Sequence, residues 1–116
     1  MINSGSVGLA WNSGAMATFA LLDTDNKAVR NVEIVYVDYC KNGIVEDFYS
    51  SDLIHTGRVD ARMNLYQLLH GVNIWDPCVE LAAKFYRQEK GTEPDNGVPP
   101  ENFIELAFNN VCGNAF

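Results

Sequence analysis

The spacing of apolar residues changes about halfway along this chain of 116 residues. In residues 32–39, VEIVYVDY, it has a period of two, so that Val32, Ile34 and Tyr36 share one face of an extended strand. From residue 58 onward, apolar positions recur every three or four residues, which is the period of an amphipathic helix. Strands followed by helices are typical of the α+β class, in which the two kinds of element segregate.

Turn residues divide the first half into four predicted strands. Asn12, Ser13 and Gly14 suit a three-residue hairpin loop with the glycine in the left-handed position. Because the third strand has apolar residues on both faces, we expect it to lie in the centre of the sheet. The predicted strands are residues 6–11, 15–23, 32–39 and 43–50.

The stretch YVDYCKNGIVEDFY, residues 36–49, has Asn42-Gly43 at its centre. Asn-Gly between two β-rich runs favours a type I′ turn, in which both central residues need a positive φ. Pairing about this turn would place Asp38 opposite Asp47. The sequence therefore predicts a β-hairpin with carboxylates and tyrosines along its polar positions.

The second half predicts three helices, at residues 58–70, 77–90 and 100–112. Pro77 and Pro100 suit the first helical position, while Gly71 suits the position just after a helix end. We therefore expect an α+β fold in which a four-stranded antiparallel β-meander is followed by three helices packed on one face. At this length the chain is expected to form a single globular domain over residues 1–116.

The chain is acidic, with 15 Asp and Glu against eight Lys and Arg, a formal net charge of −7. Such a field repels nucleic-acid phosphates and anionic membranes and attracts basic protein surfaces. We therefore expect neither a nucleic acid nor a membrane as direct partner. The alternative explanation of this negative net charge is that it only keeps the protein soluble. The final segment, residues 91–116, has four acids and no base, and its role stays open.

Three cysteines, Cys40, Cys78 and Cys112, are too widely spaced for a C-x-x-C motif and are odd in number. This pattern fits reduced thiols rather than a disulfide framework or a zinc site. The N-terminus lacks the basic region of a signal peptide, and the apolar run at residues 15–22 is too short to span a bilayer. We expect a cytoplasmic protein.

The sequence gives little support for a catalytic site. Cys40 with Asp47 and His55 would resemble a nucleophile, orienting acid and base, but only the first two are placed together by the predicted hairpin. His70, at a predicted helix end, suits the helix dipole better than a metal. No motif with metal-ligand or nucleotide-binding spacing occurs in the sequence, so we expect neither a metal nor another cofactor.

Two hypotheses for function remain open. The first is a non-enzymatic binding module that docks on a basic protein surface, such as an inhibitor of the toxin-immunity or phage-encoded anti-defence type. The alternative is a small cytosolic hydrolase or transferase that uses Cys40 or the Asp38–Asp47 pair. Under the first hypothesis, the open sheet face, with Val35, Val37 and Phe48, could also bury itself in a homodimer. The candidate partner-binding residues are Tyr36, Asp38, Tyr39, Glu46, Asp47, Tyr49 and Asp52.

Overall fold

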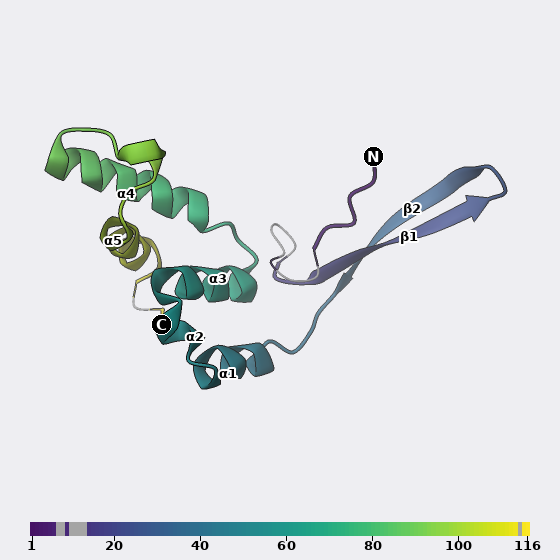
Figure 1. The fold of residues 1–116 in the computed structure, drawn as a ribbon. Helices are drawn as coiled ribbons and strands as arrows, with labels where there is room; N and C mark the ends of the chain where they lie inside the picture. Colours follow the sequence, from purple (N-terminus) through teal and green to yellow (C-terminus); the bar gives the residue numbers. More distant parts are fainter. Residues whose placement is uncertain (7–8, 10–13, 114) are drawn as a thin grey trace.

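The computed structural model describes residues 1–6, 9, 14–113 and 115–116. Two strands form an antiparallel ribbon, which we call the β-arm (residues 17–37), and the helices after it form the helical body (residues 42–112) (Figure 1). The elements are β1 (Ala17–Asp25), β2 (Ala28–Val37), α1 (Asn42–Ser50), α2 (Leu53–Thr56), α3 (Arg58–His70), α4 (Trp75–Lys90), the 3₁₀ turn η1 (Asp95–Gly97) and α5 (Glu101–Cys112).

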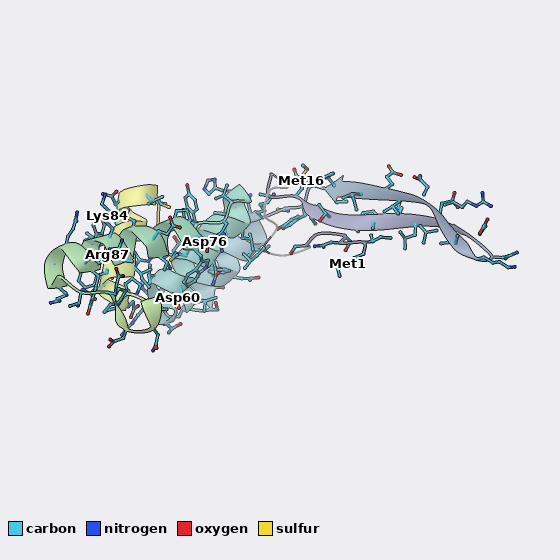
Figure 2. All side chains as sticks on the ribbon, turned by 90° about the horizontal axis from the view of Figure 1, so that it is seen from above. Met1, Met16, Asp60, Asp76, Lys84 and Arg87 are labelled. Carbon is cyan, nitrogen blue, oxygen red and sulfur yellow. The ribbon has the colours of Figure 1, made fainter. Side chains whose placement is uncertain are left out.

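The β-arm projects from the helical body and makes the molecule elongated (Figures 1 and 2). Its extents are 62 × 35 × 20 Å and its radius of gyration is 18.5 Å. A compact chain of about 100 residues has a radius of gyration of about 13 Å. Much of the chain is therefore far from any common core.

The predicted four-stranded meander is wrong, because the sheet of the described residues has two strands. The strands predicted at 15–23 and 32–39 are present with shifted ends, and they pair directly with each other. The strand predicted at 43–50 is helix α1. The strand predicted at 6–11 falls largely on residues outside the described part of the chain.

The predicted hairpin at residues 36–49 fails at its turn. Neither Asn42 nor Gly43 has the positive φ that a type I′ turn requires, and both instead belong to the first turn of α1. Ile44, Val45 and Phe48 follow at helical spacing, and all three are half-buried. The apolar contacts of a helix therefore override the local preference for a turn.

The turn that does join two strands is Asn26-Lys27, at the tip of the β-arm. The Asp25 carboxylate accepts hydrogen bonds from the backbone N–H groups of Lys27 and Ala28, at 3.3 and 3.2 Å. It also pairs with the guanidinium of Arg30. An Asp at the first position of a turn stabilises it in this way, through its own side chain.

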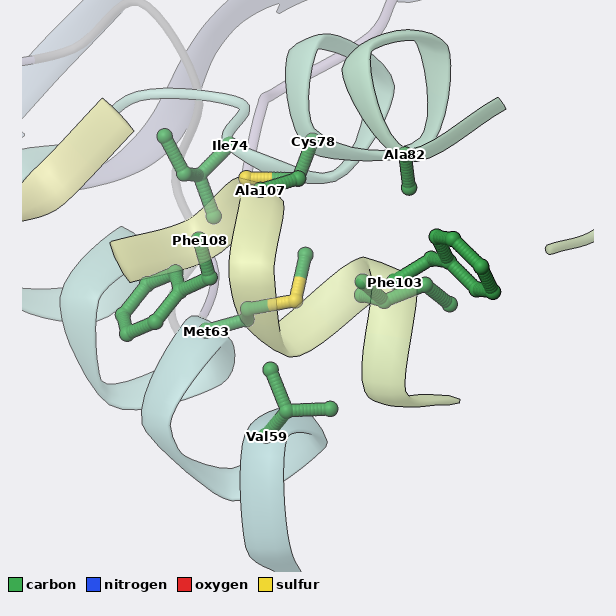
Figure 3. Packing of buried hydrophobic residues seen from close by; sticks show 9 residues of the cluster. Val59, Met63, Ile74, Cys78, Ala82, Phe103, Ala107 and Phe108 are labelled. Carbon is green, nitrogen blue, oxygen red and sulfur yellow. The ribbon is translucent and has the colours of Figure 1, made fainter. Parts of the chain in front are cut away.

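The three long helices end where predicted and begin within two residues of the predicted starts. They pack on one another and not on a face of the sheet, so the predicted packing is wrong (Figure 1). Figure 3 shows their apolar stripes meeting around Met63 and Phe108. The apolar stripes of the three helices are thus used mainly against one another. The buried core is formed by Val59, Met63, Ile74, Cys78, Ala82, Phe103, Ile104, Ala107 and Phe108.

The base of the β-arm contacts the helical body at the glycine that follows α3. Gly71 is buried with φ +65°, and a Cβ atom there would lie 2.8 Å from the Cα of Ala15. Ala15 itself is buried and has φ 63°. Only glycine permits both the left-handed backbone and this close approach.

Gly71→Ala is expected to destabilise the protein more than Gly91→Ala. Both glycines end helices with similar positive φ, 65° and 73°, so replacement costs each about 1 kcal/mol of backbone strain. Gly91 has no atom within 4 Å of an added Cβ, whereas Gly71 faces Ala15. Overpacking there adds about 1–3 kcal/mol. Denaturant unfolding measures both losses, and equal losses would show that the arm does not rest on α3.

Candidate functional site

The seven candidate residues lie along the junction between the β-arm and the helical body, and not on one face of a hairpin. Tyr36 is in β2, Asp38 and Tyr39 are in the linker, and Asp52 lies between α1 and α2. The other three, Glu46, Asp47 and Tyr49, lie on α1. All are exposed except Tyr39, which is half-buried. We call this stretch, residues 36–52, the acidic junction.

The linker holds a small charged cluster. The Asp38 carboxylate accepts a hydrogen bond from Lys41 Nζ at 3.1 Å and another from the backbone N–H of Tyr39 at 2.9 Å. The hydrogen bond from Lys41 is the largest cause that lowers the pKa of Asp38. The same ammonium lies 4.7 Å from the centre of the Tyr39 ring. Asp38 and Tyr39 are thus already engaged with Lys41, which leaves Glu46, Asp47 and Tyr49 as the freer group.

The predicted pairing of Asp38 with Asp47 is absent, because residues 42–50 are helical and form no ladder with β2. The same change removes the reason for placing Cys40 beside Asp47. Among the described residues, no group of three or more Cys, His, Asp or Glu side chains could hold a metal ion.

A surface concavity of about 680 Å³ lies between α2, α3 and α5. Its charged groups are paired across the two longer helices, Arg58 with Glu101 at 2.8 Å and Arg62 with Glu105 at 2.5 Å. The Arg58–Glu101 pair is exposed on both sides, and exposed pairs contribute about 0–1 kcal/mol. We interpret the concavity as the seam where α3 meets α5, since its cations and anions already bind each other.

The β-arm has one face without any charged side chain, which we call the uncharged face. The register pairs Thr18 with Tyr36, Ala20 with Ile34 and Leu22 with Val32. Cross-strand partners point to the same side of a sheet. After the irregularity near Asp23, Thr24 pairs with Val29 and continues this face to the tip. The uncharged face therefore consists of Thr18, Ala20, Leu22, Thr24, Val29, Val32, Ile34 and Tyr36.

The opposite face of the β-arm is mixed. Phe19 and Val35 are apolar near the base, whereas Asp23, Asn31 and Glu33 are polar toward the tip. Figure 2 shows that the arm extends away from the helical body, and no described helix covers either face. Leu22 is 50% exposed and Tyr36 54%, and on this arm they belong to one contiguous run of exposed side chains.

Sequence reasoning missed the uncharged face, since it placed the strand at 32–39 in the centre of a four-stranded sheet with helices packed on one face. The signal was present in part: Val32, Ile34 and Tyr36 were assigned to one face. What was missing was their pairing with Ala20 and Leu22, which extends the face over two strands.

Comparison with protein-family models, with curated proteins and with solved structures finds no match. Within the described residues, no helix combines the length and the apolar composition needed to cross a bilayer.

The three thiols are expected to react at very different rates. Burial raises the pKa of Cys78 to about 11, with a further contribution from Cys112, and Cys78 is fully buried. A raised pKa means less of the nucleophilic thiolate in mildly alkaline buffer. Cys40 is exposed and Cys112 half-buried, and burial also raises the pKa of Cys112.

We therefore expect alkylation in the order Cys40, Cys112, Cys78, with Cys78 reacting only when the protein unfolds. Mass spectrometry of timed iodoacetamide reactions gives the order. Cys40→Ser, as control, should remove the fast phase alone. Early alkylation of Cys78 in the folded protein would contradict the packing of α4.

Proposed function

We propose that this protein is a non-enzymatic binding module that contacts another protein through the β-arm, with the acidic junction beside the contact. The observation that carries the proposal is the uncharged face, which is exposed beyond Thr18 and Ala20 on an arm that extends from the helical body. Contiguous exposed apolar surface marks interaction sites, because burying it in a complex removes it from water.

The stability of the β-arm gives a second reason. An isolated two-stranded hairpin is marginally stable in water, and three or more strands or a packed helix are needed for independent stability. The arm has neither along most of its length within the described residues. A bound protein that covers the uncharged face would supply the missing contacts.

The acidic junction favours a basic surface next to the apolar contact. Glu46 and Asp47 are exposed on α1, beside the exposed ring of Tyr49. Tyrosine is enriched among the residues that dominate binding energy, and complementary charge speeds encounter. We propose that the protein acts in this way as an inhibitor or adaptor in the cytoplasm, where its three free thiols suit a reducing compartment.

A photo-cross-linking amino acid at Leu22 is expected to capture protein adducts in the host cell. The same amino acid at Gln88, an exposed position on α4, is the matched control and should capture few. Leu22 lies on the uncharged face and Gln88 far along the chain on a polar helix surface. Mass spectrometry of the adducts reads the result. Equal yields from the two positions would refute binding through the arm.

Reversing charge on α1 is expected to slow association with the captured protein. Glu46→Lys with Asp47→Lys should lower the association rate and weaken its dependence on salt, because both changes remove steering. Glu80→Lys with Asp95→Lys makes the same change in net charge outside the acidic junction. Surface plasmon resonance compares the two variants. Identical rates would show that only net charge acts, and an unchanged rate in both would exclude electrostatic docking.

A further inference from the structure

We propose that the free edge of β2 pairs antiparallel with β2 of a second copy, which joins two β-arms into a four-stranded sheet in the order β1–β2–β2–β1. The inference rests on the proposed function, in that it takes the β-arm as the region through which the chain binds, and it names a protein that pairs with the edge of that arm.

The two edges of the β-arm differ. At the base of β1, the backbone N–H of Thr18 donates to the carbonyl of Ser6 at 3.0 Å, and its hydroxyl donates to the same oxygen at 3.4 Å. The N-terminal segment therefore occupies this end of the β1 edge. Within the described residues, the sheet ends at β2 on the other side. The edge of β2 is the one on which another strand can be added.

The hydrogen-bond pattern identifies which backbone groups that edge presents. Because the Thr18 N–H leaves the ladder, Thr18 and Tyr36 form a non-hydrogen-bonded pair. Antiparallel pairs alternate in type, so Ala20–Ile34 and Leu22–Val32 belong to the same class. The N–H and C=O groups of Val32, Ile34 and Tyr36 thus point outward from β2, as a template for a further strand.

This edge is complementary to itself. A two-fold axis at Ile34 places the two Ile34 residues opposite each other and sets Val32 opposite Tyr36 of the second copy. Aromatic and β-branched residues are favourable cross-strand pairs. An axis at Glu33 would instead oppose two carboxylates, which is destabilising. A contact about a two-fold axis closes on itself, so pairing ends at a dimer.

Pairing along this edge would satisfy the outward N–H and C=O groups of β2. It would also convert a two-stranded ribbon into a four-stranded sheet, which is above the number needed for independent stability. Because strand addition covers an edge and not a face, the uncharged face of each arm would stay accessible.

The charge of the chain is compatible with self-pairing along the arm. Residues 17–37 have three acids and two bases, a balance of −1, so six of the seven net negative charges lie outside the arm.

Sedimentation velocity of the full chain, from low to high micromolar concentration, tests the dimer. We expect a dimer that persists or strengthens as salt is raised, because salt screens the repulsion between two acidic chains. Ile34→Lys should yield a monomer. Val98→Lys, at an exposed apolar position of the helical body, should leave the dimer intact. A wild-type monomer at every concentration, or a dimer that survives Ile34→Lys, would overturn the inference.

Disulfide trapping tests the register. In a Cys40→Ser background, Ile34→Cys places two thiols opposite each other at a Cα separation of about 5.5 Å, within the range for a disulfide. Diamide should link these chains much faster than it links Val29→Cys chains in the same background. Equal rates would overturn the pairing of β2 with β2.

Failure of the inference is distinguishable from failure of the proposed function. A monomeric chain whose Leu22 cross-linker captures a different protein would mean that this protein, and not a second copy, occupies the arm. That result would support binding through the arm and exclude pairing of β2 with a second copy. A monomeric chain that captures nothing at Leu22 would exclude both.

Discussion

A hydrogen bond across the turn between α3 and α4 fixes the short segment that contacts both α4 and the base of the β-arm. The side-chain oxygen of Gln67 accepts the backbone N–H of Ile74 at 3.0 Å, and both residues are buried. A buried N–H without an acceptor would cost about 1–3 kcal/mol. The bond therefore fixes the start of α4 and orients the Ile74 side chain toward the core. Gly71, in the same turn, receives Ala15 from the base of the β-arm. One short segment thus positions both α4 and the arm.

The same glutamine carries a cost. Its amide nitrogen has no hydrogen-bond partner among the described residues, although it is buried. A buried donor without a partner is destabilising, so an apolar side chain would be the cheaper way to fill this space. Leucine, however, could not accept the N–H of Ile74. Glutamine is therefore favoured at position 67 because its side-chain oxygen accepts the Ile74 N–H, even though its amide nitrogen has no partner among the described residues.

Local signals in the sequence were sufficient for the three long helices α3, α4 and α5 and for the existence of the two strands. Gly71 and Gly91 mark helix ends through their positive φ, and Pro77 falls in the first turn of α4. The same kind of signal failed at Asn42-Gly43, because small and polar residues also suit the first turn of a helix. The half-buried positions of Ile44, Val45 and Phe48 decide between the two, and these depend on contacts with distant residues.

The candidate residues were predicted with the wrong geometry, for a related reason. Periodicity tells which residues of one strand share a face, but it does not tell which strand lies beside it or what covers that face. Val32 and Ile34 were therefore assigned to a covered central strand, although they lie on an uncovered ribbon.

The arrangement separates two contributions to binding that proteins often combine in one patch. Apolar surface is concentrated on the β-arm, whose net charge is only −1, while the acids lie mainly in the junction and the helical body. Buried apolar contacts chiefly set how long a complex lasts, whereas charges outside the contact chiefly set how fast it forms. Because α1 follows the arm after a short linker, one bound protein can touch both regions. The two regions can be altered independently, since neither the acids of α1 nor the uncharged face belongs to the buried core.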